Sequence, residues 1–388
     1  MELYVHIPFC VKKCDYCDFL SGPANNDIKE KYVEALIKEI KASKEYSSKE
    51  DKVTSIFIGG GTPSILESEQ LTRIFTALYN SFIIDENAEI TVEMNPGTVT
   101  EDKFKALKVA GVNRLSIGLQ SANDSELKIL GRIHTYKDFE EAYKMAKEAG
   151  FENINVDLIS AVPGQSVDSW AYTLRKVASL HPQHISAYSL IIEEGTPFYD
   201  KYGEDGCNGC GNNILELPDE KSERLMYEDT KKILLEYGYH RYEISNYAKK
   251  GFECEHNKGY WKCEDYLGLG LGSSSLIKGK RFHNTCDMDT YLQNSKNPEK
   301  IREDETYLTI EEKIEEFMFL GLRMTKGISK SDFKKRFNIN IEEVYKEELR
   351  NLIEEGLINE EKDMLYLTDR GTDISNQVFV EFMEPVIK

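Results

Sequence analysis

The chain reads Cys10-Val-Lys-Lys-Cys14-Asp-Tyr-Cys17 directly after its first predicted strand, Leu3–Ile7. A loop in this position can fold three thiolates around one inorganic cluster. The C-x3-C-x2-C spacing suits three corners of a [4Fe–4S] cube and leaves the fourth iron open to another ligand. A structural zinc ion is the alternative interpretation, but it usually takes four protein ligands, and only His6 lies nearby as a fourth. The pattern therefore predicts that Cys10, Cys14 and Cys17 hold an iron–sulfur cluster.

Around this loop, short β-branched runs alternate with amphipathic helical stretches. The predicted strands are Leu3–Ile7, Ser55–Ile58, Glu89–Met94, Arg114–Leu119, Asn153–Ile159 and His184–Leu190. The first predicted helix has Asp27 as its N-cap, and the later ones lie around Leu71–Tyr79, Asp102–Ala110, Asp138–Ala149, Val167–Leu180 and Asp219–Tyr237. Six strand–helix units in series favour parallel strands with right-handed crossovers, so the predicted fold class is α/β with a partial (β/α)6 barrel. Its chemistry should lie on the loops that leave the carboxyl ends of the strands.

The C-terminal part has a different pattern, which predicts a second domain. A polar stretch at Gln293–Thr306 indicates a linker, and two helices with apolar faces, a small hairpin and a last helix follow it. This order is typical of a winged-helix module. We therefore divide the chain into residues 1–296, a barrel with extensions, and residues 297–388, the winged-helix domain. The extensions are a flexible Gly- and Asn-rich loop at 203–217 and a segment at 240–290.

The composition excludes several classes of protein. The 388 residues carry 68 acidic and 49 basic side chains, a formal net charge of −19, and such a field repels nucleic acid. The basic residues of the winged-helix module are followed directly by glutamates, so docking fits the module better than DNA binding; they are Lys330, Lys334, Lys335 and Arg336. A mean hydropathy of −0.50 and the lack of an apolar stretch of roughly 20 residues exclude a membrane-embedded protein. The start Met1–Val5 has no basic and apolar leader, which predicts a cytoplasmic location.

Polar residues at the ends of later strands mark a predicted ligand site. The run Gly59-Gly60-Gly61-Thr62-Pro63 follows the second strand, where glycines let the backbone approach a ligand closely; a tight turn is the alternative. Glu93, Gln120 and Asp157 lie at the ends of later strands, and a charge in an apolar run is costly unless it is paired, so these side chains should face a cavity. Arg132 is either a solvated helix charge or a clamp for a carboxylate.

The cysteine run resembles the signature of the radical S-adenosylmethionine (SAM) superfamily, whose fold is the partial barrel inferred above. The resemblance implies that the amino and carboxylate groups of SAM chelate the open iron. One electron from the reduced cluster would then cleave the sulfonium to methionine and a 5′-deoxyadenosyl radical. It also implies that Tyr16 packs near the adenine and that an electron donor such as flavodoxin or ferredoxin serves the cluster.

Longer phrases resemble the oxygen-independent coproporphyrinogen III oxidase family over nearly the whole chain. They include Tyr4-Val-His-Ile-Pro-Phe-Cys10, Ser116–Ser121, Asn155–Ile159, His184–Leu190 and Leu367–Gly371. By that resemblance, the residues that line the SAM site are Tyr4, Gly60, Gly61, Thr62, Glu93, Gln120, Arg132 and Asp157.

Two features place the resemblance in the haem chaperone branch of that family. True oxidases carry a fourth cysteine two residues after the third, where this chain has Phe19. The run His256-Asn-Lys-Gly-Tyr-Trp261 is similar to the H-N-x-x-Y-W motif associated with haem binding in that branch, which implies haem contacts by His256, Asn257, Tyr260 and Trp261. A neutral imidazole is a good axial ligand for haem iron, and aromatic rings can cover a porphyrin face. The alternative is that His256 caps a turn while Tyr260 and Trp261 fill the core.

The resemblance therefore implies a haem chaperone that binds a [4Fe–4S] cluster, SAM and haem and transfers haem to acceptor haemoproteins, with no catalytic residue assigned. Two alternatives stay open: an oxidase that decarboxylates two propionates of coproporphyrinogen III, and a radical SAM enzyme with an unrelated substrate. The sequence leaves open the identity of the acceptor, productive cleavage of SAM, and formation of a homodimer. Cys207 and Cys210 have metal-ligand spacing, with Cys254, Cys263 or Cys286 as partners, but free thiols are the favoured interpretation.

Overall fold

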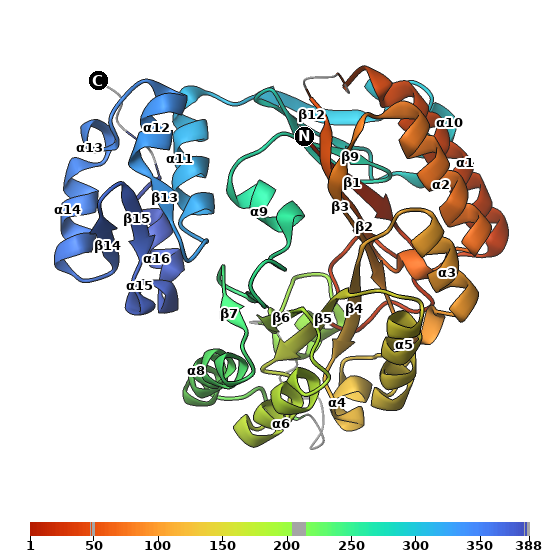
Figure 1. Cartoon of the computed structure of the whole chain (residues 1–388), viewed down its shortest axis with the longest axis horizontal. Helices are drawn as coiled ribbons and strands as arrows, with labels where there is room; N and C mark the ends of the chain where they lie inside the picture. Colours follow the sequence, from red (N-terminus) through yellow and green to blue (C-terminus); the bar gives the residue numbers. More distant parts are fainter. Residues whose placement is uncertain (47, 49–50, 204–214, 384, 386–388) are drawn as a thin grey trace.

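The computed structural model describes residues 1–46, 48, 51–203, 215–383 and 385. Over these residues the chain forms a curved 12-stranded sheet, with helices on its outer side, and a small 3-stranded sheet near the C-terminus. Figure 1 shows helix α9 (Glu255–Trp261) on the inner side of the curve, between the large sheet and the C-terminal helices.

Six parallel strands form the centre of the large sheet, in chain order. Their bounds are β1 (Glu2–Ile7), β2 (Val53–Gly60), β3 (Ile84–Met94), β4 (Arg114–Gln120), β5 (Asn153–Ser160) and β6 (His184–Ser189). The six predicted strands coincide with these, except that β3 begins earlier than predicted. The α/β class and the partial barrel of six strand–helix units are confirmed, and the carboxyl ends of all six strands lie at one edge, where the chemistry was expected.

Helices connect these strands and cover the outer face of the sheet. Their bounds are α1 (Asn26–Ala42), α2 (Ser68–Ser81), α3 (Glu101–Val109), α4 (Asp124–Ile129), α5 (Tyr136–Glu148), α6 (Val167–Ala178), α7 (Pro197–Tyr202) and α8 (Glu220–Glu236), with short 3-10 helices η1 (Ser43–Tyr46), η2 (Pro63–Ile65) and η3 (Pro96–Thr98). The predicted N-cap of α1 is wrong. Asn25 takes that role, because its side chain accepts a hydrogen bond of 2.9 Å from the backbone N–H of Ile28, so the helix begins before Asp27.

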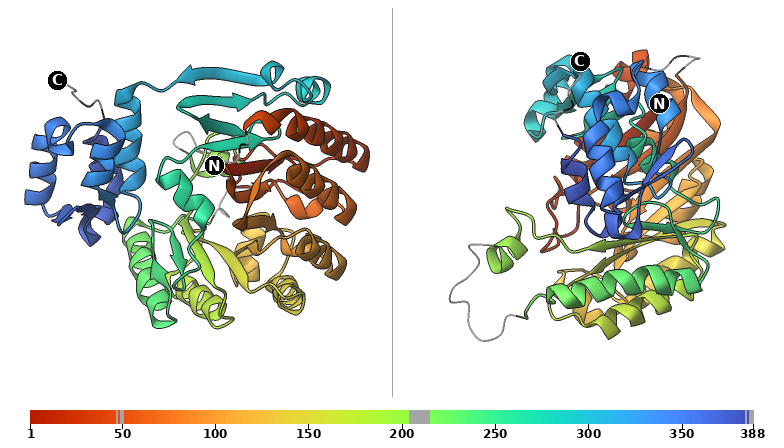
Figure 2. Two further views of the ribbon diagram at one scale, coloured as in Figure 1. Left: turned by 45° about the horizontal axis from the view of Figure 1, so that its top comes forward. Right: turned by 90° about the vertical axis from the view of Figure 1, so that its left-hand side faces the viewer.

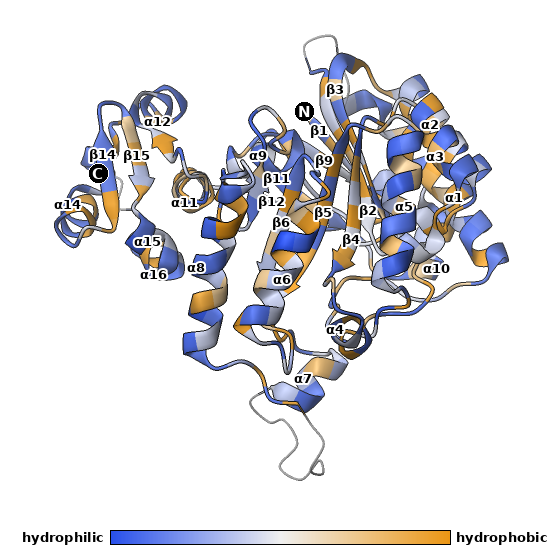
Figure 3. Ribbon diagram, turned by 60° about the horizontal axis from the view of Figure 1, so that its bottom comes forward, coloured by the Kyte–Doolittle hydropathy of each residue, from blue (hydrophilic) through white to orange (hydrophobic). Residues whose placement is uncertain are grey.

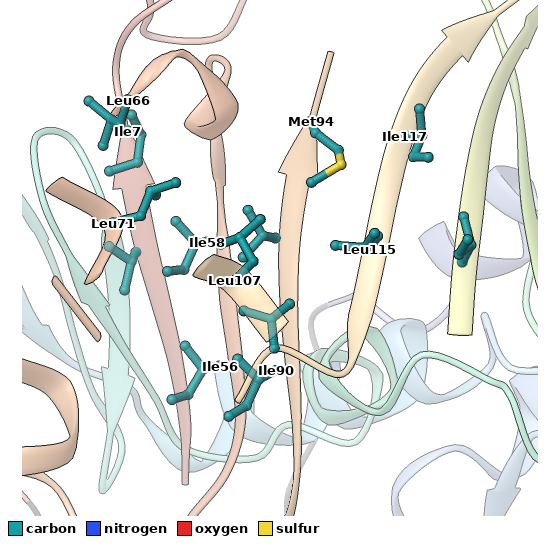
Figure 4. Close-up of a cluster of buried hydrophobic side chains, with 14 of the residues drawn as sticks. Ile7, Ile56, Ile58, Leu66, Leu71, Ile90, Met94, Leu107, Leu115 and Ile117 are labelled. Carbon is teal, nitrogen blue, oxygen red and sulfur yellow. The ribbon is translucent and has the colours of Figure 1, made fainter. Parts of the chain in front are cut away.

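The core lies between the parallel strands and these helices. Figure 4 shows Ile58 of β2 and Leu115 of β4 in one apolar layer with Leu71 of α2 and Leu107 of α3, all of them fully or almost fully buried. Strands covered on both faces are expected to be rich in β-branched and other apolar residues. Figure 3 shows this as orange along the central strands, against helices of mixed colour.

Short strands that the sequence analysis did not predict extend the sheet at both edges. β9 (Tyr266–Leu269) pairs in parallel with β1, and antiparallel β10 (Ser274–Ile277), β11 (Lys280–Asn284) and β12 (Arg302–Tyr307) follow it outward. At the opposite edge, β8 (Asn246–Ala248) and β7 (His240–Arg241) lie beside β6. The predicted linker is therefore wrong in part: it contains the end of α10 (Met288–Asn294), η4 (Pro298–Lys300) and β12, which belongs to the large sheet. In our proposed division, the second domain begins after β12 instead of at residue 297.

The C-terminal elements have a core of their own. They are α11 (Ile310–Gly321), β13 (Ile328–Ser329), α12 (Lys330–Phe337), α13 (Ile341–Val344), α14 (Lys346–Glu354), β14 (Ile358–Glu361), β15 (Met364–Leu367), α15 (Asp369–Asp373) and α16 (Ser375–Val380). The strand order β13-β15-β14 and the helices before the hairpin confirm the predicted winged-helix arrangement. Figure 2 shows these elements on one side of the barrel, joined to it through β12.

Helix α9 is a main contact between the barrel and the winged-helix domain. The guanidinium of Arg323 lies 4.5 Å from the ring of Trp261, and Arg336 donates a hydrogen bond of 2.9 Å to the carbonyl of Lys262. A guanidinium over an aromatic face is a favourable contact.

In the described part of the chain, no helix combines the length and the hydrophobicity needed to span a bilayer.

Candidate functional site

The three predicted cluster cysteines lie on one loop that leaves the carboxyl end of β1. The loop closes on itself, because Cys10 donates its backbone N–H to the carbonyl of Gly22 and Gly22 donates to that of Pro8, at 3.0 and 3.1 Å. Within it, the backbone N–H of Cys17 donates to the carbonyl of Cys14 at 3.2 Å. All three side chains are free thiols of intermediate exposure, so the loop presents three sulfur atoms without burying them.

Polar side chains from two other loops reach these sulfur atoms. The hydroxyl of Thr62 donates to Sγ of Cys10, and Nη1 of Arg132 donates to Sγ of Cys14, each at 3.5 Å. Arg132 is held in place by a second bond of 2.6 Å from its Nη2 to the carbonyl of Gly118. Burial raises the pKa of the Cys17 thiol. Hydrogen bonds to cluster sulfur tune the potential of an iron–sulfur centre, so Arg132 and Thr62 are suited to that task.

The donor set fits a cluster better than a single metal ion. Among the residues that the structure describes, no group of three or more His, Cys, Asp or Glu side chains is gathered closely enough to hold one ion. A structural zinc ion would draw four ligands to one centre. In a cubane cluster each thiolate binds an iron of its own, so thiols spread along one loop suit it.

A cavity of about 400 Å3 opens beside the cysteine loop. Its lining includes most of the residues predicted for the cluster and SAM: Cys10, Cys14, Cys17, Tyr16, Gly60, Gly61, Thr62, Glu93, Gln120, Arg132 and Asp157. Tyr16 packs at its edge, with its ring 6.5 Å from that of Phe198. Tyr4 does not line this cavity. Its hydroxyl pairs with Nδ1 of His6 at 2.9 Å and faces a second, larger cavity.

Two glycines at the end of β2 cannot be replaced without a clash. Gly60 has a φ of +106°, and a Cβ there would overlap the ring of His6. A Cβ at Gly61 would lie 2.7 Å from the carbonyl oxygen of Phe9. The backbone N–H of Gly60 donates to Oε2 of Glu93 at 3.1 Å, so the turn and the carboxylate support each other. Gln120, at the end of β4, also has a positive φ, of 76°, and such strain in a non-glycine residue is frequent at functional sites.

Two carboxyl groups of intermediate exposure line this cavity. Burial, and then the neighbouring Asp157, raises the pKa of Glu93 to about 8. Burial also raises the pKa of Asp157. Hydrogen bonds from Ser116 at 2.9 Å and Asn155 at 2.8 Å act in the opposite direction and lower it in part. Protonated at neutral pH, Glu93 can release its proton when a cation approaches, which suits the amino group or the sulfonium of SAM.

This pKa predicts that stability depends on pH between about 5 and 8. In the unfolded chain Glu93 ionises near its ordinary pKa of 4.5, whereas the folded protein keeps the proton up to about pH 8. The contribution of Glu93 to stability is therefore fully present below about pH 4.5 and is lost as pH rises to about 8, at about 1.4 kcal/mol per pH unit at most. Urea unfolding at several pH values between 5 and 8 gives the change in the free energy of unfolding per pH unit. This change should be smaller for Glu93→Gln than for the wild-type protein. Glu86→Gln, at an exposed position of β3, is the control, and equal slopes for all three proteins would contradict the prediction.

The larger cavity, of about 740 Å3, adjoins the first and shares Phe19, Gly60, Glu93, Asp157 and other residues with it. Its walls come from the parallel strands, from α9 and from α11. The lining includes eight Phe, Tyr or Trp side chains and all four residues of the predicted haem motif: His256, Asn257, Tyr260 and Trp261. Phe19, where oxidases have a fourth cysteine, is exposed and stands at the junction of the two cavities.

His256 is the most enclosed member of the motif. It is 1% exposed, and its ring stacks on Phe57 at 5.1 Å between centroids. Nδ1 lies 2.8 Å from the hydroxyl of Ser55, and Nε2 lies 3.1 Å from that of Tyr260. Burial, and then the positive charge of Arg114, lowers the pKa of His256 to about 3, so the imidazole is neutral. A neutral imidazole can bind iron. For Nε2 to do so, it must first give up its hydrogen bond to the Tyr260 hydroxyl.

The sequence analysis missed several residues that line the larger cavity. Arg114 of β4 is 2% exposed and lies 3.9 Å from Glu89. The reasoning that selected Glu93, a charge within an apolar strand, could have found it. Arg281 and Glu316 left no such signal, because they lie on a short strand near the edge of the sheet and on a helix of the other domain.

The remaining cysteines do not form a second metal site among the described residues. Cys254 is buried, with Sγ 3.3 Å from Oε1 of Glu89. Cys263 lines the larger cavity and Cys286 is exposed. Cys207 and Cys210 lie outside the described residues, as does most of the predicted loop at 203–217.

Comparisons with known proteins agree with this architecture. The family model of the radical SAM superfamily matches residues 4–177, and that of the HemN C-terminal domain matches residues 308–374. The chain is 38% identical over 381 residues to the heme chaperone HemW of Bacillus subtilis (strain 168), covering 98% of each chain. It is 37% identical over 380 residues to the heme chaperone HemW of Lactococcus lactis subsp. lactis (strain IL1403), covering 98% of this chain and 96% of that one.

Among solved structures, the coproporphyrinogen III oxidase HemN of Escherichia coli, a radical SAM enzyme, superposes with a TM-score of 0.84. The match covers 99% of this chain and 90% of that one, at 24% identity. At this identity the match concerns the fold alone. Both domains therefore share their architecture with a known radical SAM protein.

Proposed function

Because this chain belongs to the HemW family of radical SAM proteins, we propose that it binds haem and delivers it to acceptor haemoproteins. The observation that carries the proposal is the larger cavity, which gathers His256, Asn257, Tyr260 and Trp261 on one wall. Its volume of about 740 Å3 lies in the range of cofactor pockets, and its aromatic walls suit a flat apolar macrocycle.

In this proposal the smaller cavity holds the [4Fe–4S] cluster and SAM. Cys10, Cys14 and Cys17 would bind three irons, and Arg132 and Thr62 would donate to their sulfur atoms. The backbone at Gly60 and Gly61 and the remaining polar lining would hold SAM. When bound and reduced, the cluster supplies the electron that cleaves the sulfonium of SAM. The residues shared by the two cavities would bring SAM next to the haem.

Exposed lysines favour an acidic electron donor at the cluster. Lys12 and Lys13 lie on the cysteine loop at the rim of the smaller cavity, on a chain whose net charge is −19. Complementary charge speeds the encounter of two proteins. We propose that a flavodoxin or a ferredoxin docks there.

Size-exclusion chromatography with and without the cluster tests whether the protein forms a homodimer.

A transfer experiment tests the proposed function. The anaerobically reconstituted protein is titrated with haem, and the loaded protein is mixed with an apo-haemoprotein such as apomyoglobin. We expect a defined Soret band on binding and its conversion to the acceptor's spectrum.

A parallel incubation with SAM, a reductant and coproporphyrinogen III is analysed by mass spectrometry. Protoporphyrinogen formed over many turnovers would establish the oxidase activity instead, and absence of haem binding would leave an unrelated substrate.

The role of His256 in this cavity has its own test. If His256 binds the iron, His256→Gln should shift the Soret band and weaken haem binding about tenfold or more. Tyr260→Phe frees Nε2 and should keep the wild-type band. His283→Gln is the control, because His283 lies on β11 against Asp304 and lines neither cavity. An unchanged band and affinity in His256→Gln would make His256 a core residue that supports α9.

A further inference from the structure

An ion pair in the lining of the larger cavity joins the barrel to the winged-helix domain. Arg281 of β11 and Glu316 of α11 both line the cavity. Their contact is bidentate: Nη1 lies 2.7 Å from Oε1, and Nη2 donates to Oε2 at 2.9 Å. The side chain of Arg281 is 42% exposed and that of Glu316 is 10% exposed.

Positive charge is scarce on the walls of this cavity. Among the described lining residues, the lysine and arginine side chains are those of Arg114 and Arg281 alone. Arg114 is 2% exposed, deep in the sheet and next to Glu89. Arg281 is partly open and is paired across the sheet with Leu276, and the lining also includes the apolar side chains of Trp261 and Leu320. The cavity therefore combines apolar lining with one accessible guanidinium.

We propose that Arg281 binds a propionate carboxylate of the haem and that Glu316 occupies the guanidinium when the ligand is absent. The inference rests on the proposed function and deepens it by naming the group that recognises the charged edge of the macrocycle. Arginine suits this task because its planar fork pairs with a carboxylate through two parallel hydrogen bonds. The carboxylate of Glu316 already pairs with Arg281 in this geometry. A propionate has the same charge and shape, so it can take the place of Glu316.

The exchange has a structural consequence. Arg281 lies on the extended sheet and Glu316 on the first helix of the winged-helix domain, so their contact is lost when the propionate binds. Haem occupancy is thereby coupled to the contact between β11 and α11. With a propionate at Arg281, the apolar part of the macrocycle would be free to contact aromatic lining residues such as Phe57.

The experiment compares haem with its dimethyl ester, which keeps the macrocycle and removes both carboxylates. For Arg281→Gln we expect about tenfold weaker binding of haem and unchanged binding of the ester. For Glu316→Gln we expect severalfold tighter binding of haem, because the competing carboxylate is gone, and again no change for the ester. Lys280→Gln is the matched control. Lys280 is the neighbouring residue of β11, pairs with Glu305 at 2.8 Å and does not line the cavity.

The outcomes separate this inference from the proposed function. No binding of either ligand by the wild-type protein would defeat the proposed function. Normal haem binding with equal losses for haem and ester in Arg281→Gln would show that Arg281 only supports the cavity wall. Wild-type affinity for haem in Arg281→Gln, or weaker haem binding in Glu316→Gln, would also overturn the assignment.

Discussion

Replacing Cys14 with alanine is expected to abolish the cluster completely. The chain supplies three thiols to the site, and the fourth iron of a cubane has no protein ligand, so losing one thiolate leaves too few ligands. The replacement also removes the sulfur to which Arg132 donates, which leaves a partly buried positive charge without that partner. Anaerobic reconstitution with iron and sulfide, read by absorbance and iron content, should give the broad cluster spectrum for the wild-type protein and none for Cys14→Ala.

Cys286→Ala is the matched control for this experiment. Cys286 is an exposed free thiol that lines neither cavity, so its removal should leave the spectrum and the iron content unchanged. Circular dichroism of the apo-proteins checks that both variants are folded. A normal cluster in Cys14→Ala would refute the assignment of the cysteine loop.

A single added methyl group in α9 is expected to weaken haem binding at least tenfold. Gly259 lies directly over Glu2, and its Cβ would overlap all three atoms of that carboxyl group. Glu2 is 2% exposed, so its carboxyl group can move aside only by displacing the atoms packed around it. Gly259→Ala should therefore push α9 away from β1 and cost about 3 kcal/mol in the free energy of unfolding. Because α9 carries His256 and Trp261, haem titration should show at least a tenfold loss of affinity.

A second substitution makes this prediction specific to the clash. Glu2→Ala removes the overlapping atoms, so the double variant Glu2→Ala, Gly259→Ala should regain most of the lost stability, as a double-mutant cycle in urea would measure. Gly97→Ala is the control, because its Cβ would meet nothing closer than 3.5 Å. Equal losses with and without Glu2 would show that the effect of Gly259→Ala does not arise from this contact.

The main features that could be predicted from the sequence depend on patterns within short windows. The six parallel strands were found because β-branched runs and helical periodicity alternate along the chain, and the cysteine loop because its spacing is contained in eight residues. The family resemblance was confirmed by relatives that match almost the full length. By contrast, β7 to β12 were missed, because β7 to β11 are only two to five residues long and β12 is almost entirely polar.

The strand order of the barrel, the loop that carries Cys10, Cys14 and Cys17, and the winged-helix module could be read from the sequence because local patterns specify them. The make-up of the two cavities could not. Tyr4 belongs to the predicted SAM set, yet it faces the larger cavity, because the direction of its side chain depends on how β1 sits between β2 and β9. The pair of Arg281 and Glu316 exists only because two domains meet at that point. Such contacts join residues far apart in the chain, so they arise from packing and leave no periodic signal in the sequence.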